Sequence, residues 1–535
     1  MLVKSFLNIF APNLVTDKQL TEYDRIVYPS YTHPQTHPDR LAVIGRLFGL
    51  DPAPVGRCRV LEVGCGDGTN LAPMAWALPE SEFAGVDLAS RPVEKGQEMV
   101  RDLSLANLRL VQADLTELNL DWGQFDYIIA HGLYSWVPNA VRQHLLGLCR
   151  RLLTPHGIAF ISYNVLPGCH LRTMLREMML FHVRGFEAAE ERVQQATALV
   201  NFLTQAQETR DEYRLWMRAE LERIQEHAPG HLYHDDLAPI NEPQYFTQFM
   251  SEAARQGLQY VGEADYFEMS DEIFDQPVRQ TLQRLAGSRL LREQYLDFLK
   301  CRRFRQTLLC QREATVRPEP QAEQVTGFLV SSAASCTSGE VDLRPGVNCA
   351  FETPKGGKCQ TDLAPGKAAL SILGSLWPMA LKFEDLLGQI RQRLDQAGVR
   401  ETAGAVSAGA IRDFLLRLYA GGVVEFRTWL PPVASRAGAR PVVHPVARWQ
   451  AAHTDSVASL FHIAVKVEDE VGRFLLASLD GTLDRPGMLA KLWDMLKSRN
   501  ALDLRGGGEE AAKRELELKL EENLQKLARL GLLAG

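Results

Sequence analysis

Residues 59–68 read RVLEVGCGDG, a short apolar run that ends in a turn with glycine at every second position. We predict a buried parallel strand from Val60 to Gly64 and a helix from Asn70 to Ala77. Glycine tolerates positive φ and has no Cβ, so the backbone of this turn can pass close to a bound ligand. A strand that leads through such a turn into a helix is typical of the nucleotide-binding end of a doubly wound sheet.

Four more apolar segments follow this turn and are predicted to be strands. Helical segments alternate with them, and this alternation favours parallel strands joined by right-handed crossovers. Ligands of such sheets bind at the carboxyl ends of the strands, where Asp87, Asp114, His131 and Tyr163 stand. Taken singly, each aspartate is better explained as a helix cap or turn residue. The predicted strands are 82–88, 108–113, 125–130 and 157–163, and the predicted helices are 91–104 and 139–153.

The spacing of the glycines differs from that of a dinucleotide site. NAD-binding turns read G-x-G-x-x-G, whereas this turn reads E-x-G-x-G-x-G and resembles motif I of the class I S-adenosylmethionine (SAM)-dependent methyltransferases. The resemblance implies that Asp87, nineteen residues after Gly68, accepts hydrogen bonds from both ribose hydroxyls. It places adenine beside Asp114 and Leu115. The expected SAM-binding residues are Glu62, Gly64, Cys65, Gly66, Gly68, Asn70, Asp87, Leu88, Asp114, Leu115 and His131.

Composition limits the class of protein. With 535 residues we expect two to four domains. The formal net charge of −7 argues against broad binding to nucleic acid phosphates. We interpret the basic stretch Arg289–Arg305 first as a solvated helix face. The nine cysteines form no C-x-x-C pair, so we expect reduced thiols and no metal site.

Nothing in the sequence predicts a membrane span. The apolar start, residues 1–15, resembles a signal peptide, but Asn8, Pro12 and Asn13 interrupt it and no small-x-small cleavage site follows. No stretch reaches eighteen apolar residues. A cytoplasmic location is therefore the default expectation.

The predicted architecture is α/β, with a Rossmann-like seven-stranded class I methyltransferase sheet. Strands six and seven, 258–264 and 304–311, are expected as an antiparallel hairpin at one edge. A helical module precedes strand six, over 171–184, 187–206 and 208–226, and an insertion there can roof the acceptor side of the cleft. The expected domains are a SAM-binding core with an N-terminal lid (1–169), a helical regulatory or substrate module (170–257), completion of the sheet (258–317), a middle β and winged-helix-like domain (324–430) and a C-terminal helical domain (442–535).

The winged-helix-like prediction rests on three helices followed by a strand. The helices are expected over 367–377, 383–396 and 408–420, and the strand over 423–430. DNA binding is the usual association of that fold, but the third helix offers only Arg412 and Arg417, so a structural or protein-binding role is favoured. Beyond it we predict mostly helix over 449–480, 485–498 and 509–530, with Gly531 as a C-cap.

Three further segments narrow the resemblance. They are YDRIVYPSYTHPQTHPDRLA (23–42), SYNVLPGCHLRTMLREMMLFH (162–182) and HLYHDDLAPINEPQYFTQFMSEAARQGLQYVGEA (231–264). Together they resemble the bacterial methyltransferases with a methyltransferase regulatory domain, whose characterised members are the rickettsial-type protein lysine methyltransferases that modify outer-membrane proteins. One departure is Cys169, where the family would have tryptophan, and it puts the acceptor in doubt.

Candidate catalytic residues come from the N-terminal segment and from the strand ends. Tyr28 or Tyr31 is expected to line the methyl-transfer site from a lid, with packing against the sheet as the alternative. His131, Tyr134 and Trp136 follow strand four, where the acceptor nitrogen usually sits, and Tyr163 ends strand five facing the same cleft. The D/N-P-P-Y tetrapeptide of methyltransferases acting on DNA bases is absent.

Three functions remain open from the sequence. The favoured one is a protein lysine N-methyltransferase acting on a bacterial surface or outer-membrane protein. The alternatives are a small-molecule methyltransferase of secondary metabolism and a non-catalytic SAM-binding sensor. All three need SAM, so the motif does not separate them. The partner is expected to be a protein rather than a nucleic acid, and the oligomeric state is open, with a dimer among the options.

Overall fold

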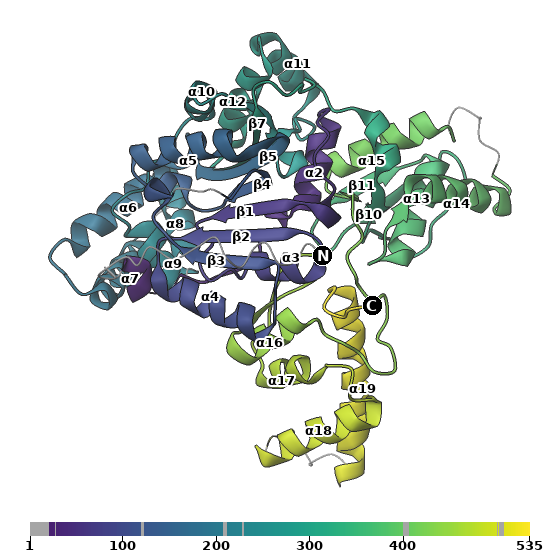
Figure 1. The fold of residues 1–535 in the computed structure, drawn as a ribbon. Coiled ribbons are helices and arrows are strands. Elements are labelled where there is room, and N and C mark those ends of the chain that lie inside the picture. The colour runs from purple at the N-terminus through teal and green to yellow at the C-terminus, as the bar shows by residue number, and fades with distance from the viewer. Residues whose placement is uncertain are drawn as a thin grey trace.

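The computed structural model describes residues 21–26, 28–118, 122–206, 211–226, 229–399, 406–499, 501 and 508–535. The signal-like stretch 1–15 and residues 208–210 of a predicted helix lie outside this part. A seven-stranded sheet forms the centre of the described chain, and helical segments lie beyond both ends of its strands (Figure 1).

The order of the strands in this sheet is β3-β2-β1-β4-β5-β7-β6. Strands β1 to β5 are parallel to their neighbours, whereas β7 runs antiparallel to both β5 and β6. All seven predicted strands are present, and the predicted antiparallel pair lies at one edge. Their bounds are β1 Arg59–Val63, β2 Glu82–Asp87, β3 Leu108–Gln112, β4 Phe125–Ala130, β5 Leu153–Asn164, β6 Leu258–Glu263 and β7 Phe304–Gln311.

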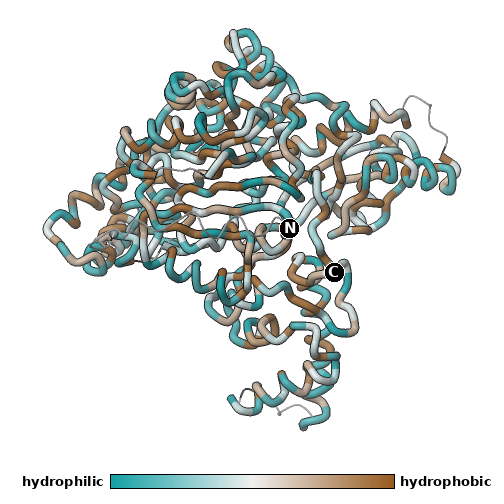
Figure 2. The backbone as a smooth tube through the Cα atoms, in the orientation of Figure 1, coloured by the Kyte–Doolittle hydropathy of each residue, from teal (hydrophilic) through white to brown (hydrophobic). Residues whose placement is uncertain are grey.

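The central strands are apolar on both faces because helices cover both faces. Four consecutive residues of β1, from Val60 to Val63, are buried, and so are the last four residues of β4. Figure 2 shows this concentration of hydrophobic residues along the sheet. The helices packed around the sheet are α2 Pro38–Leu47, α3 Leu71–Ala77, α4 Ser90–Asp102, α5 Asn139–Leu152 and α10 Phe246–Arg255.

The inserted module between β5 and β6 has a small core of its own. Residues from Leu175 to Leu237 form this core, and Ile26 of the N-terminal segment packs against it. Its last helix runs directly into a π-helical turn, Leu232–Asp236. The helices are α6 His170–Val183, α7 Ala189–Gln205, α8 Glu212–Gln225 and α9 Pro229–His231, and the short helix α1, Glu22–Arg25, lies in the N-terminal segment.

The basic stretch 289–305 is not simply a solvated helix face. It contains α12 (Arg289–Lys300), which follows α11 (Gln276–Leu285) between β6 and β7. Arg302 and Arg305 are buried, and Arg305 pairs with Asp297 at 2.8 Å. Buried guanidinium groups need such partners, so part of this positive charge holds the sheet edge to α12.

The middle segment contains the predicted three helices and strand. β12 and β13 pair with β8 in a three-stranded sheet, and β9, β10 and β11 form a second small sheet. The elements are β8 Leu329–Ser331, β9 Ser335–Cys336, β10 Cys349–Glu352, β11 Lys358–Thr361, α13 Ala364–Leu376, β12 Leu381–Lys382, α14 Phe383–Gln396, α15 Ala408–Ala420 and β13 Glu425–Arg427.

The prediction of mostly helix over 449–480 is wrong in its middle. Residues 456–466 form a β-hairpin, in which Val457 lies opposite Val465, and β-branched pairs of this kind favour strands over helix. Gly531 adopts a φ of +70° after the last helix, as a C-cap glycine does. The elements are α16 Pro445–His453, β14 Ser456–Ala458, β15 Ala464–Lys466, α17 Glu470–Ser478, α18 Arg485–Ser498 and α19 Gly508–Arg529.

Buried apolar residues form separate hydrophobic cores, which indicate the parts of the chain that pack together. One large core joins residues of the central sheet to residues 325–426, and a separate core lies within 443–533. The division of the chain into five domains at the predicted boundaries stays a proposal. Within the part of the chain that the structure describes, no helix is both long and apolar enough to cross a membrane.

Candidate active site

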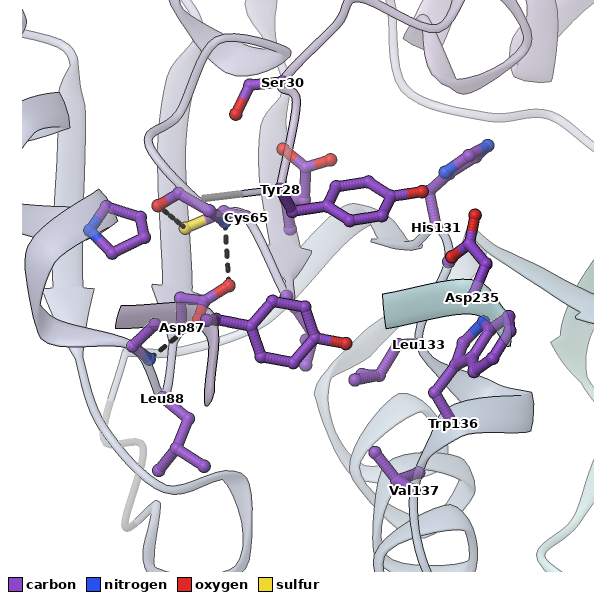
Figure 3. A pocket seen from close by; sticks show the side chains of 18 of the residues that line it. Tyr28, Ser30, Cys65, Asp87, Leu88, His131, Leu133, Trp136, Val137 and Asp235 are labelled. Atoms are coloured by element: carbon purple, nitrogen blue, oxygen red, sulfur yellow. Dashed lines mark hydrogen bonds between the residues drawn. The ribbon is translucent and has the colours of Figure 1, made fainter. Parts of the chain in front are cut away.

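A cavity of about 690 Å³ lies at the carboxyl ends of the parallel strands. Its wall is built mainly from four parts of the chain: the glycine turn after β1, the ends of β2, β3 and β4, the N-terminal segment from Thr21 to His33, and the inserted module. Figure 3 shows side chains from these parts pointing into one space. The predicted strand-end ligand site is therefore a real hollow in the fold.

The glycine turn exposes backbone to this cavity. Gly64 and Gly66 line it and have φ values of +77° and +54°, which side chains with a Cβ rarely adopt. A Cβ added to Gly66 would meet only Ser30 Oγ, at 3.9 Å, so it would project into open space. Gly68 does not line the cavity, and a Cβ there would lie 2.7 Å from Leu110 Cδ1. Gly68 thus serves packing rather than the cavity wall.

Asp87 at the end of β2 is fixed by backbone donors. Its Oδ2 accepts a hydrogen bond from the Gly66 amide at 2.8 Å, and its Oδ1 accepts one from the Ala89 amide at 2.9 Å (Figure 3). Burial raises the pKa of this carboxyl above its ordinary value, against the opposing effect of these amides. Both carboxylate oxygens retain further lone pairs for a ligand.

Glu62 contributes a second carboxylate and is buried at 3% exposure. Its Oε1 accepts a hydrogen bond of 2.8 Å from Asn70 Nδ2, but its Oε2 has no hydrogen-bond partner among the described residues. Burial raises the pKa of Glu62 to about 8. Glu62 and Asn70 both line the cavity, so a donor from a ligand can satisfy the orphaned oxygen.

The third strand end completes this side of the cavity. Asp114 lines it, and its Oδ1 accepts hydrogen bonds from the Thr116 amide and hydroxyl at 2.8 and 2.7 Å. Leu115, nearly buried, and Leu88, exposed, add apolar surface. A polar group beside apolar neighbours in this way suits a flat heteroaromatic ring.

The opposite side of the cavity is aromatic and acidic. Tyr28 and Tyr31 of the N-terminal segment line it, together with Asp235 of the π-helical turn. Figure 3 shows the Tyr28 and Asp235 side chains close together on this side of the cavity. Burial, with a further effect of Asp235, raises the pKa of Tyr28 far above its ordinary value, so the phenol stays protonated. π-Helical turns are frequent at functional sites.

His131 at the end of β4 stands between the two sides. Its ring stacks on that of His33, with 3.8 Å between the ring centroids. Burial lowers the pKa of His131 to about 3 and that of His33 to about 4. Both rings are therefore neutral at physiological pH and act as uncharged walls of the cavity.

Comparisons with known proteins agree with this geometry. Residues 60–157 match the model of a methyltransferase domain, residues 228–311 match that of a predicted methyltransferase regulatory domain, and residues 439–532 match that of a PKMT C-terminal winged helix domain. An uncharacterised protein of Rickettsia prowazekii is 38% identical over 234 residues, which cover 44% of this chain and 94% of that protein.

The chain belongs to the SAM-dependent methyltransferases with a methyltransferase regulatory domain.

Two further relatives extend the likeness. A second uncharacterised Rickettsia prowazekii protein is 34% identical over 308 residues, 57% of this chain and only 55% of that relative. The solved structure of PKMT2 from Rickettsia typhi is 27% identical, covers 95% of this chain and 100% of its own, and superposes with a TM-score of 0.83. A structure of the same protein in complex with AdoHcy gives a TM-score of 0.82. This methyltransferase therefore shares its architecture with the rickettsial protein over nearly its whole length.

The winged-helix match falls on an unexpected segment of the methyltransferase. The matched residues, 439–532, were expected only as a helical domain, whereas a winged-helix-like domain was expected within 324–430, where it stays a prediction. Residues 439–532 contain a β-hairpin among helices, which fits the description of that domain.

Two predicted catalytic residues of the methyltransferase lie outside the cavity. Tyr163 is 1% exposed, stacks on Phe249 and bonds Thr307 Oγ1 at 3.0 Å, so it does not face the cleft. Tyr134 is fully buried and donates to Glu252 at 2.6 Å. Both rings pack beneath α10, which covers this part of the sheet. The other predicted candidates do line the cavity, namely Tyr28, Tyr31, His131 and Trp136.

Sequence reasoning placed the inserted module over the acceptor side of the cleft but did not name the residues that it contributes. Glu220, His231, Asp235 and Asn241 from that module line the cavity, as do Arg172 and Cys169 at its start. Asp235 could not be identified from hydrophobic periodicity, because the π-helical turn that contains it is only five residues long and has no repeating pattern. The only available clue was that His231–Ala264 belongs to the family-like stretches. Within the described residues no group of three or more His, Cys, Asp or Glu side chains is arranged to hold a metal ion.

Proposed function

We propose that this methyltransferase is a protein lysine N-methyltransferase, with SAM on the glycine-turn side of the cavity and the lysine amine on the side of Tyr28 and Asp235. The observation that carries the proposal is the placement of Tyr28 and Asp235 side by side, where they face the glycine turn across one cavity (Figure 3). The proposal extends the resemblance to PKMT2, whose name marks it as a protein lysine methyltransferase.

The cofactor side suits SAM group by group. The unpartnered Glu62 Oε2 offers an acceptor for the ammonium of the amino-acid tail. The open space at Gly66 admits that tail and the ribose, and Asp87 accepts from the ribose hydroxyls. Asp114 and Leu115 suit the adenine. When bound, SAM supplies the methyl group and a positive sulfonium centre.

The acceptor side suits a lysine amine. A free lysine has a pKa of about 10.4, so its neutral form costs about 4.6 kcal/mol at pH 7. Desolvation in a cavity beside a positive centre reduces this cost. The raised pKa of Tyr28 keeps its phenol protonated, so in the proposed complex the hydroxyl donates toward Asp235, and the lone pairs of the Tyr28 oxygen accept an N–H of the amine and orient it. Asp235 is then in place to take the departing proton.

The acceptor side offers carboxylate oxygens to an amine. Glu220 lines the cavity and is 1% exposed, and its Oε2 has no hydrogen-bond partner among the described residues. Its other oxygen pairs with Arg303 and Arg223. Arg303 and Arg172 also line the cavity, so this side carries both charges, and Glu220 Oε2 and Asp235 are the groups in it that suit a lysine amine.

The rim of the cavity favours an acceptor carried on a protein. Tyr28 and Tyr31 are 38% and 37% exposed, so the acceptor side opens to solvent. A side chain borne on a large partner can enter there, whereas the alternative of a small-molecule methyltransferase favours a closed pocket. The proposal includes a cytoplasmic enzyme that meets a bacterial surface or outer-membrane protein before its export.

The test uses methyl-labelled SAM with bacterial protein fractions, followed by mass spectrometry of the labelled products. We expect label on lysine, and we expect Tyr28→Phe and Asp235→Asn each to lower kcat about 100-fold while the affinity for SAM stays within threefold. Tyr213→Phe is the matched control, because Tyr213 is an exposed tyrosine of α8 outside the cavity.

Other outcomes would count against the proposal. Label found only in small molecules would favour the metabolite alternative. SAM binding with no turnover on any fraction would favour a sensor.

A further inference from the structure

A histidine of the C-terminal domain is buried against the glycine turn of the sheet domain. His462, between β14 and β15, has its Nε2 atom 2.8 Å from Oδ1 of Asn70, the residue that precedes α3. The two residues are 392 positions apart in the chain. His462 is 3% exposed, and its ring meets that of His37 edge-on at 5.3 Å.

Asn70 is the centre of a saturated network. Its Oδ1 also accepts a hydrogen bond from the His33 amide at 3.0 Å, and its Nδ2 donates to Thr36 Oγ1 at 3.0 Å and to Glu62 Oε1 at 2.8 Å. One carboxamide thus connects strand β1, the N-terminal segment over the cavity, and the C-terminal domain. Both donors and both lone pairs of the amide are in use.

This network fixes the tautomer of His462. A backbone N–H can only donate, so the atom that accepts from His33 must be the oxygen of Asn70. His462 must then donate to the same oxygen, which requires the proton on Nε2. Burial, helped by His37 and His33, lowers the pKa of His462 well below its ordinary value, so the ring is a neutral donor.

His462 has a backbone conformation that residues with a side chain rarely adopt. Its φ is +61°, in the left-handed region that glycine or asparagine occupies more readily. The turn around it is closed by hydrogen bonds from the His462 amide to Ser459 O and from the Ser459 amide to Ile463 O, both 2.9 Å. Such strain in a well-packed turn points to a role for the side chain that is held there.

We propose that His462 is a positioning residue for SAM binding, which acts through Asn70 to hold Glu62 and the N-terminal segment in their binding positions. The C-terminal domain would then set the affinity of the sheet domain for its cofactor. The inference rests on the proposed placement of SAM beside Glu62 and Asn70. It does not depend on the identity of the acceptor.

Two substitutions that differ by one methylene test this role. His462→Gln keeps an N–H donor at about the position of Nε2, whereas His462→Asn is too short to reach Asn70 but tolerates the left-handed backbone. We expect the Asn variant to raise the Kd for AdoHcy about tenfold in calorimetry, as the loss of one buried hydrogen bond does. We expect the Gln variant to stay within threefold of the parent.

A second contact between the same domains provides the control. Trp449 Nε1 donates to Asp102 Oδ2 at 3.0 Å, so it ties α16 to α4 away from Asn70. Trp449→Phe removes this contact and should leave the Kd for AdoHcy unchanged. Thermal melting without ligand reports the folded state of each variant.

Three results would overturn the inference. The first is an Asn variant that folds and binds AdoHcy like the parent. The second is an equal loss of affinity in Trp449→Phe, which would reduce His462 to a domain contact. The third is a Gln variant as weak as the Asn variant. A failure of lysine methylation with intact AdoHcy binding would instead concern only the proposed acceptor.

Discussion

The side chain of Asp87 and the backbone of Gly66 are joined by a hydrogen bond of 2.8 Å across neighbouring strands. The same carboxylate also holds the Ala89 amide at the start of α4. Asp87 therefore shapes the glycine turn as well as offering oxygens to a ribose. A substitution at Asp87 therefore affects both the turn and the ribose contacts.

Asp87→Ala should weaken SAM binding by about 1.5–3 kcal/mol, because charge-assisted hydrogen bonds are lost and the Gly66 amide loses its acceptor. Calorimetry with SAM or AdoHcy measures this change. Glu82→Gln is the control, since Glu82 lies at the other end of β2 with an exposed side chain paired to Arg59. Parent-like binding by Asp87→Ala would mean that the ribose is placed elsewhere.

Gly66→Val should abolish detectable SAM binding. The new side chain would project into the cavity, where only Ser30 Oγ lies within 4 Å of the added Cβ, and the φ of +54° would be strained. The matched control is Gly56→Val, because a Cβ at Gly56 meets nothing within 4 Å and its backbone is not in the left-handed region. Thermal shift with and without SAM gives the readout, and a full shift for Gly66→Val would contradict the placement of SAM at this turn.

SAM binding should become tighter as the pH rises from about 6 to 8. Burial raises the pKa of Glu62 to about 8, so the carboxyl is protonated in the free protein at pH 7, and a bound ammonium favours its ionised form. At pH values between the ordinary pKa of a glutamate and the raised pKa of Glu62, the folded state binds more protons than the unfolded state. The contribution of Glu62 to the free energy of unfolding therefore falls as the pH rises through this range.

The check for Glu62 is calorimetry in buffers of different ionisation enthalpy, which counts protons released on binding. Glu62→Gln should lose the release that comes from this carboxyl. This comparison separates proton release by Glu62 from proton release by the α-amino group of the ligand, whose ordinary pKa of about 7.7–8.0 lies in the same range. Identical proton release by parent and variant would exclude Glu62 as the group that titrates.

Tyr163→Phe should cost about 1 kcal/mol of stability and leave kcat unchanged. The substitution removes only the buried hydroxyl contact with Thr307, which keeps its own bond to Glu263. Denaturant unfolding and steady-state kinetics measure the two quantities. A large fall in kcat with a normal unfolding curve would return Tyr163 to the catalytic site.

The central sheet could be predicted well because each parallel strand contains a short, mostly apolar run, and a glycine or a polar residue such as Gly64, Asp87 or His131 stands at its carboxyl end. β4 and β7 have the predicted bounds, and β1 differs by one residue at each end. The failures have physical causes. The hairpin at 456–466 was hidden because short strands lack a helix-length pattern. Tyr163 was misplaced because alternation along a strand sends it to the face covered by α10.

The candidate site divides in the same way. The cofactor side depends on a local motif, so Gly64, Gly66 and Asp87 can be named from the sequence alone. The acceptor side is assembled from segments some 200 residues apart, such as Tyr28 and Asp235, and no local pattern links them. Asn70 and His462 are still further apart in the chain, so no local motif could have predicted the hydrogen bond between them.

The distance along the chain between Asn70 and His462 has a consequence during synthesis. On the ribosome the glycine turn emerges long before residue 462, so the buried side of the Asn70 carboxamide stays open to water until that histidine has emerged. A nascent chain that stops short of this histidine would contain every strand of the sheet and yet lack the last donor of the network.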